Sequence, residues 1–224
     1  MQKRVFEWQG QEFVGLSDEA RSGGSPFDQT RDVLERMDLE LRKEETTLLG
    51  TVRTRLWARD AGARNRGSRA RVEVLSGGAR SASSSYIAPD HLKTSADIAI
   101  DLVAMKPAKG LQKTLVEYDP PIVPLRYLVY GPLVHLSGVT SVKATLAEQA
   151  AEVLQAISGS LEHAGTSWDK VVKVSFHLLR GESQAEMERL FGNRAPNAEI
   201  DYALVDGYST PDKRVEIEVT AAVE

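Results

Sequence analysis

The sequence contains one internal repeat, and this repeat limits the folds that the chain can adopt. When the sequence is shifted by 120 positions, its first half aligns with its second half without a gap for more than forty residues, and Leu34 matches Leu154. Past residue 60 the offset is 117, so that Ile98 matches Val215. A repeat unit of about 120 residues has the size of a domain, so we expect two copies of one domain rather than a solenoid.

The composition is that of an ordinary folded protein and excludes several classes of function. Of the 224 residues, 42% are hydrophobic and 27% are charged, and the net charge of −4 gives no general attraction to nucleic acid or to an anionic membrane. No apolar run approaches the ~20 residues of a membrane span, and the N-terminus has no signal-peptide pattern, so we expect a cytoplasmic protein. Because there is no cysteine, disulfides and thiolate chemistry are excluded.

The second copy has the clearer secondary-structure pattern. Residues 144–164 carry apolar side chains at helical spacing, which predicts a helix with one buried stripe. Residues 172–178 alternate between apolar and polar side chains, as a strand with one buried face does. Similar patterns predict strands at 111–118, 127–137, 200–205 and 215–223, and a short helix at 184–191.

The first copy follows the same order. The pattern predicts a helix at 28–43 and strands at 5–8, 12–16, 52–58, 83–87 and 98–105. The unit therefore has the order β-β-α-β-α-β-β, and two helices covering one face of a mixed sheet make a two-layer α+β domain. We place the first domain at residues 1–106 and the second at 111–224, joined by a linker that contains Pro107.

Several segments, in this order and spacing, resemble the RidA/YjgF family. They are Leu-Ser-Gly at 136–138 after a strand, Ser-Trp-Asp-Lys-Val-Val-Lys-Val at 167–174, and Val-Glu-Ile-Glu-Val-Thr-Ala at 215–221. The resemblance covers roughly residues 113–223, and Ala-Arg-Ser at 79–81 extends it weakly to the first copy. It implies a chorismate-mutase-like α+β unit that assembles as a trimer around a central barrel, with sites in the clefts between neighbouring units. For this chain we therefore expect a homotrimer of two stacked rings of like domains.

The resemblance also implies a chemistry. Members of the best-known subgroup hydrolyse reactive enamines and imines, such as 2-aminoacrylate, to a keto acid and ammonia. In them an arginine binds the substrate carboxylate, and a glutamate and a serine–glycine pair help to hold water or substrate. This reaction implies no cofactor and a small, carboxylated substrate as the partner of the protein.

The family's charged site residues are divided between the two copies. The arginine falls on Arg80 in the first copy and near Asn197 in the second, whereas the glutamate falls on Glu216 in the second copy and on Ala99 in the first. Arg80 can form a two-pronged contact with a carboxylate, which lysine cannot reproduce; its alternative role is a surface arginine. Glu216 can serve as a base, and its alternative role is an outward-facing strand residue.

The serine–glycine pair is intact only in the second copy, as Ser137-Gly138, and reads Ser17-Asp18 in the first. Ser137 and Gly138 can offer a hydroxyl and a backbone N–H to a carbonyl group or a developing negative charge, or can simply end a strand. Asp18 is a candidate base or an ordinary turn residue. Since neither copy holds a complete set, we expect one working copy, anchored by Arg80, and one copy that serves as scaffold.

Two further groups of residues carry weaker signals. Five arginines between positions 59 and 71 form a basic cluster without interleaved aromatic residues, which indicates a solvated arm or a subunit contact rather than an RNA surface. The four histidines lack metal-site spacing, although His135 and His177 lie at matching depths on strands that we expect to be neighbours and can line a cleft.

Three functions remain open. The first is a RidA-like hydrolase or deaminase that acts on a carboxylated imine, enamine or amide. The second is a non-catalytic module of the same fold that binds a small molecule or supports assembly. The third is a ring-opening hydrolase that serves one pathway.

Overall fold

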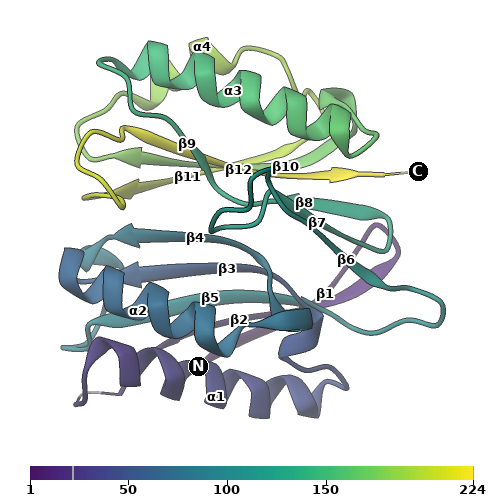
Figure 1. The fold of residues 1–224 in the computed structure, drawn as a ribbon, viewed down its shortest axis with the longest axis vertical. Helices are drawn as coiled ribbons and strands as arrows, with labels where there is room; N and C mark the ends of the chain where they lie inside the picture. Colours follow the sequence, from purple (N-terminus) through teal and green to yellow (C-terminus); the bar gives the residue numbers. More distant parts are fainter. Residues whose placement is uncertain (22, 224) are drawn as a thin grey trace.

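The chain folds into two α+β units whose sheets face each other, with the helices on the two outer faces (Figure 1). The structure, a computed structural model, describes residues 1–21 and 23–223. The N-terminal unit is made, in chain order, of β1 (Gln2–Trp8), β2 (Gln11–Glu19), α1 (Pro26–Lys43), β3 (Thr51–Ala58), α2 (Ala61–Val74), β4 (Ala82–Ile87) and β5 (Ile98–Met105). This is the predicted order β-β-α-β-α-β-β, and the predicted fold class is confirmed.

The C-terminal unit repeats this order but has four strands, instead of two, before its first helix. It is made of β6 (Lys113–Val116), β7 (Tyr127–Tyr130), β8 (Leu133–Leu136), β9 (Val139–Thr140), α3 (Leu146–His163), β10 (Val171–Leu179), α4 (Gln184–Phe191), β11 (Glu199–Val205) and β12 (Val215–Ala222). The helices α1 and α3 begin 120 positions apart, and the strands β5 and β12 begin 117 positions apart. Both offsets are those of the repeat in the sequence.

One predicted strand is wrong. The apolar run at 127–137 was expected to be a single strand, but it forms the hairpin β7–β8, in which Tyr130 pairs with Leu133 across Gly131 and Pro132. Gly131 has a φ of +59°, a conformation that glycine adopts readily, and Pro132 cannot donate a backbone hydrogen bond to a ladder. Both strands are largely buried, so the run shows no polar break at the turn.

The two long helices begin with the same capping arrangement. Ser25 caps α1 and Thr145 caps α3, and each hydroxyl accepts a hydrogen bond from a backbone N–H three residues later. The acidic side chains at those positions, Asp28 and Glu148, accept a hydrogen bond from the backbone N–H of the cap residue, which completes a capping box. Each helix therefore starts at a position fixed by its own sequence. None of the helices in the described part of the chain is long and apolar enough to cross a membrane.

The two sheets have equivalent strand orders. The first runs β1-β2-β5-β3-β4 and the second β11-β10-β12-β8-β7-β6, with β9 beside β12. In both, the strand after the long helix pairs in parallel with the strand after the short helix, as β3 does with β4 and β10 with β11. This arrangement leaves β4 at the edge of the first sheet, where it meets the second unit (Figure 1).

A buried polar layer lies between the two sheets. Glu218 on β12 accepts contacts from two arginines of β3, with Arg55 Nη2 at 2.8 Å and Arg53 Nη1 at 2.9 Å from its Oε2. Arg53 Nη2 also donates to the carbonyl oxygens of Leu136 and Val219, each at 3.1 Å. Burial by itself would raise the pKa of Glu218, but the two guanidinium groups lower it well below its usual value. The layer thus joins the units through a charged cluster inside the protein.

Apolar clusters flank this layer and complete the interface. One gathers Phe13, Val52 and Met105 against Leu125 and Leu128, and another packs Trp57 and Tyr86 with Val205 and Tyr208. The inner face of each sheet is therefore covered by the other unit of the same chain. Assembly into a homotrimer stays a prediction.

Candidate active site

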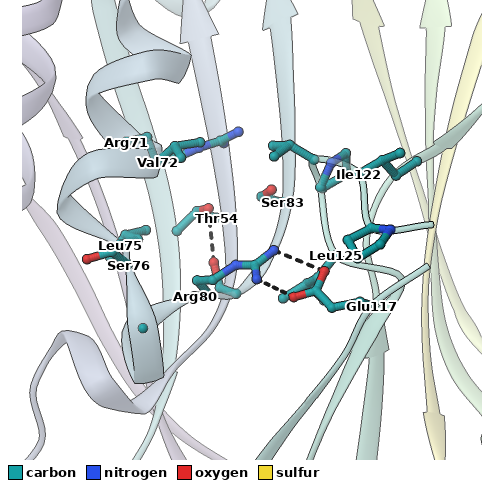
Figure 2. Close-up of a pocket in the computed structure, with 15 residues that line it drawn as sticks. Thr54, Arg71, Val72, Leu75, Ser76, Arg80, Ser83, Glu117, Ile122 and Leu125 are labelled. Atoms are coloured by element: carbon teal, nitrogen blue, oxygen red, sulfur yellow. Dashed lines mark hydrogen bonds and ion pairs between the residues drawn. The ribbon is translucent and has the colours of Figure 1, made fainter. Parts of the chain in front are cut away.

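A cavity of about 720 Å³ lies between the two units, beside the beginning of β4 (Figure 2). One wall comes from α2 of the N-terminal unit, through Arg71, Val72 and Leu75. The opposite wall comes from the segment 117–125 of the C-terminal unit, which includes Glu117 and Ile122. This volume lies in the range of pockets that hold drug-sized ligands, and two different units build it.

Arg80 is placed in this cavity by a tight turn. The turn Gly77–Ala79 ends where Arg80 begins, and the Arg80 backbone N–H donates to the Gly77 carbonyl oxygen at 3.2 Å. The guanidinium points across the cavity to Glu117, with which it forms a two-pronged ion pair; Nη2 and Oε2 are 3.2 Å apart, and Nη1 contacts Oε1 (Figure 2). The two side chains are 34% and 31% exposed. The predicted carboxylate-binding arginine therefore already holds a carboxylate of its own chain.

Ser137 and Gly138 of the C-terminal unit lie against β4 of the N-terminal unit. The backbone N–H of Ser83 donates to Ser137 Oγ at 3.3 Å, and the Gly138 N–H donates to the Ser83 carbonyl oxygen at 3.4 Å. Ser83 follows Arg80 by three positions and also lines the cavity. The interface therefore joins the serine–glycine pair of one copy to the arginine segment of the other.

Glu216 lies directly behind this contact. Its carboxyl group is so close to Gly138 that a Cβ added there would stand 2.5 Å from Cδ of Glu216, so this position requires glycine. The Tyr86 hydroxyl of β4 donates to Glu216 Oε1 at 3.0 Å. Glu216 is 7% exposed and is thus not an outward-facing strand residue. It does not line the 720 Å³ cavity but lies one layer deeper, behind Ser137 and Gly138.

The surroundings of Glu216 favour its neutral form. Burial raises its pKa to about 7, and the negative charge of Glu218 acts in the same direction. The hydrogen bond from Tyr86 and the positive charges of Lys213 and Arg64 oppose this rise. A carboxyl group with a pKa near neutrality can both accept and donate a proton in water near pH 7, as a general acid–base group must.

Arg71 is a functional candidate that the sequence pattern did not reveal. Its side chain is buried, lines the cavity, contacts the Ser84 carbonyl oxygen and donates to Ser85 Oγ at 2.8 Å. Burial lowers its pKa to about 10, while the charge of Glu216 raises it, so Arg71 and Glu216 act on each other electrostatically. The basic cluster at 59–71 was predicted to be a solvated arm or a subunit contact. This prediction is wrong for Arg71, which is buried inside the chain, whereas Arg66 of the same cluster is exposed.

The sequence of α2 itself indicates that Arg71 is buried. The buried face of α2 carries Ala63, Gly67 and Ala70, and Arg71 continues this stripe by one more helical turn after Gly67. Small residues on a basic helix indicate the side that packs closely against a sheet. An arginine in line with them is then placed inside the protein, whereas Arg66 and Arg69 are exposed.

The candidates Ser17 and Asp18 lie elsewhere. They line a separate cavity of about 420 Å³ that also includes Trp57 and His91. Asp18 forms ion pairs with Arg36 and with the N-terminal amine, the latter at 3.1 Å. The structure therefore does not bring Asp18 together with Arg80, and the carboxylate is already engaged in structural contacts.

The division of the site residues between the two copies has a geometric pattern. Arg80 from the first copy and Ser137, Gly138 and Glu216 from the second lie around one interface inside the chain. The replaced position Asn197 is exposed and precedes β11, which forms the edge of its sheet. Ser17 and Asp18 lie in the second cavity, together with Ala99. The arginine, the glycine and the glutamate are thus kept where the two units meet and are replaced where they do not, whereas the serine is kept in both places.

The two buried histidines belong to the polar layer. His135 on β8 and His177 on β10 are separated by β12, so their strands are not neighbours as expected. His177 stacks on Tyr86 with ring centroids 4.2 Å apart. Burial lowers the pKa of His177 to about 3 and that of His135 well below its usual value, so both are neutral at pH 7. Across the described residues, no group of three or more acidic, histidine or cysteine side chains is arranged to hold a metal ion.

Comparisons with known proteins agree with this architecture. Residues 122–223 match the family model described as Endoribonuclease L-PSP. A crystal structure of a YjgF/YER057c/UK114 family member from Mycobacterium tuberculosis is 23% identical, covers 50% of this chain and 100% of its own, and has a TM-score of 0.45. A Rid family protein from Yersinia pestis is 20% identical with the same coverages and the same TM-score. No curated protein matches the sequence.

One solved structure resembles nearly the whole chain. The crystal structure of a chorismatase covers 97% of this chain and 79% of its own, with 15% sequence identity and a TM-score of 0.69. At this identity the likeness concerns the fold, and it shows that two such units occur together in another protein.

Proposed function

The chain belongs to the RidA/YjgF family through its C-terminal half, and on that premise we propose that it is a hydrolase of a carboxylated imine or enamine with one composite site between its two units. The observation that carries the proposal is that Ser83, which lines the cavity three positions after Arg80, contacts Ser137 and Gly138 of the other copy, with Glu216 directly behind them. Each copy has lost residues that the other copy keeps, so the two copies together supply the residues of one complete site.

Arg80 supplies the binding of the substrate. Its guanidinium offers two parallel N–H donors to a carboxylate, which fixes the orientation of the substrate as well as its position. Glu117 occupies those donors with the geometry that a substrate carboxylate would have. Arg71 adds a second positive charge on the wall of the cavity, so that the cavity favours an anion.

Glu216 supplies the proton transfers. In the proposed reaction water attacks the imine carbon and the C–O bond forms. Because Glu216 lies behind Ser137 and Gly138 rather than on the cavity wall, the proton of that water passes through a further water molecule to the ionised carboxyl group of Glu216. The same proton is then given to the nitrogen, which completes a carbinolamine. The proton of the carbinolamine hydroxyl group next passes to the nitrogen by the same route, the C–N bond breaks as the C=O bond forms, and the products are a ketone and ammonia. A pKa of about 7 suits a group that must first accept and then donate a proton.

The test is the decay of a 2-imino acid that is generated in the assay by an amino-acid oxidase. We expect the purified protein to accelerate this decay and Arg80→Ala to remove most of the acceleration, since the two-pronged contact is lost. Arg69→Ala is the matched control, because Arg69 is an exposed arginine paired with Glu73 on α2. If the protein does not change the decay, or if both variants behave alike, the proposal is wrong.

A second candidate is the hydrolysis of a larger, ring-bearing carboxylate. The cavity of about 720 Å³ is large for a three- or four-carbon acid, and Val72, Leu75, Ile122 and Leu125 give it apolar walls. The solved structure that shares the fold of nearly the whole chain is that of a chorismatase, which makes chorismate a direct probe. Consumption of chorismate without acceleration of imine decay would favour this candidate.

A separate experiment tests the alternative that the protein binds a small molecule without catalysing a reaction. Thermal unfolding in the presence of keto acids and of chorismate reports binding whether or not turnover occurs, because a ligand that binds the folded state raises Tm. Stabilisation by such a ligand, abolished in Arg80→Ala and unaccompanied by any turnover, would identify a binding module.

A further inference from the structure

We propose that Glu117 is a built-in competitor that occupies the carboxylate site of Arg80, so that a ligand carboxylate binds only by displacing it. This inference rests on the proposed function in one respect, since it takes Arg80 as the anion-binding group of the cavity. The inference goes beyond the proposed function because it makes Glu117 the residue that sets the affinity of the cavity for carboxylates and selects among them. Glu117 comes directly after β6, at the start of the segment that forms the far wall of the cavity.

The geometry of the pair is that of a bound ligand rather than of a buried structural bridge. Both carboxylate oxygens of Glu117 face the two terminal nitrogens of Arg80 inside the cavity (Figure 2). About one third of each side chain is exposed, so both remain accessible to water and to a ligand. A partly exposed ion pair contributes little to stability, and a ligand carboxylate that makes the same two contacts can replace it.

The rest of the cavity shows what the displacing ligand must bring. Val72 on α2 and Leu75 at the C-terminal cap of α2 face Ile122 and Leu125 across the cavity, so an apolar body can lie between them. Val72 is 47% exposed and Ile122 is 54% exposed, which leaves apolar surface to be covered. A ligand that covers this surface gains binding free energy that compensates for displacing Glu117, whereas a short acid gains almost none. The site therefore selects a carboxylate joined to an apolar or ring-bearing body.

Three compounds probe this selection by isothermal titration calorimetry. Phenylpyruvate carries a carboxylate and an apolar ring, pyruvate carries the carboxylate alone, and the methyl ester of phenylpyruvate carries the ring without the charge. We expect the wild-type protein to bind phenylpyruvate more tightly than pyruvate and to bind the ester least well. Tighter binding of the ester than of the acid would overturn the assignment of a carboxylate ligand.

Glu117→Gln tests the competition itself. The glutamine keeps the size of the side chain but lacks the charge that holds Arg80, so a larger fraction of molecules has a free guanidinium. We expect the Kd of phenylpyruvate to fall by about three- to tenfold, because the apparent affinity scales with the fraction of the binding-competent state. Glu117→Ala, which removes the carboxylate altogether, must change the Kd in the same direction.

The control is Glu73→Gln, which removes one negative charge from the exposed ion pair with Arg69 on the same unit. We expect it to leave the Kd within a factor of two. An unchanged or weakened affinity in Glu117→Gln would overturn the proposal, since a weaker affinity would mean that Glu117 orients Arg80 for the ligand. Because these experiments measure binding, an absence of imine turnover would count against the proposed reaction and not against the competition.

Discussion

The carboxyl group of Glu216 lies over Gly138, and the space between them does not admit even a methyl group. A Cβ at position 138 would stand 2.5 Å from Cδ of Glu216, which is closer than real Cβ contacts come. Glu216 is buried and cannot easily move aside. We therefore expect Gly138→Ala to displace the carboxyl group and to lower kcat/KM by at least about tenfold, an effect of roughly 1.4 kcal/mol on the barrier.

A second glycine offers the matched control for Gly138. Gly159 lies in α3, and a Cβ added to it would meet no atom within 4 Å. Gly159→Ala should keep the activity and stabilise the fold by roughly 0.5–1 kcal/mol, since alanine is the better helix former. Chemical denaturation and steady-state rates of the two variants check both expectations. Equal activity of the two variants would show that the position of Glu216 does not matter.

The stability of the protein should depend on pH through Glu216. The folded state raises the pKa of this group from 4.5 to about 7, so between these values the folded state binds more protons than the unfolded state. Stability from this group is therefore fully present below pH 4.5 and is lost as the pH rises through 7, by roughly 3 kcal/mol in total. Glu216→Gln should become more stable relative to the wild type by about this amount between pH 4 and pH 8. A stability difference that is the same at both pH values would contradict the raised pKa.

The same group should shape the pH dependence of the rate. As the proposed base, Glu216 must be ionised when water attacks, so kcat/KM should rise with pH with a midpoint near the pKa of about 7. In Glu216→Gln this rise should disappear along with most of the activity. A profile that is flat between pH 5 and pH 9 in the wild type would exclude Glu216 from the proton transfer.

The charged cluster between the sheets should be sensitive to the loss of the Glu218 carboxylate. Glu218 contacts both Arg53 and Arg55, and all three side chains are largely buried. Glu218→Gln removes this contact and leaves only the negative charge of Asp201 acting on the two cations, which should destabilise the fold by roughly 3–5 kcal/mol and lower Tm by about 10 °C. Glu117→Gln, at a partly exposed pair, should change the stability by less than about 1 kcal/mol. Similar Tm values for both variants would contradict a structural role of the buried cluster.

The sequence was sufficient to predict the fold because its pattern is local and occurs twice. The stripe of α1 and the alternation of β3 each recur 120 positions later, and a signal seen twice outweighs the ambiguity of either copy. The hairpin at Gly131 and Pro132 was missed because both of its strands are buried, which removes the alternation that normally marks a strand boundary.

The site could be predicted only in part. Arg80, Ser137, Gly138 and Glu216 were identified one by one, but the packing of the two sheets that brings them to one interface is a long-range arrangement that no local pattern encodes. The expectation of one working copy and one scaffold followed from comparing each copy with a complete set. The structure places the retained residues of both copies around one interface, and we propose that they form one composite site there. One working copy with one scaffold stays the alternative prediction.

The most direct test of the composite site is a crystal structure of the protein with bound phenylpyruvate. The account predicts that the ligand carboxylate lies on the guanidinium of Arg80 in place of Glu117, with the keto group directed toward Ser137 and Gly138 and the ring between α2 and the segment 117–125. A ligand found in the cavity of Ser17 and Asp18, or bound without contact to Arg80, would contradict it.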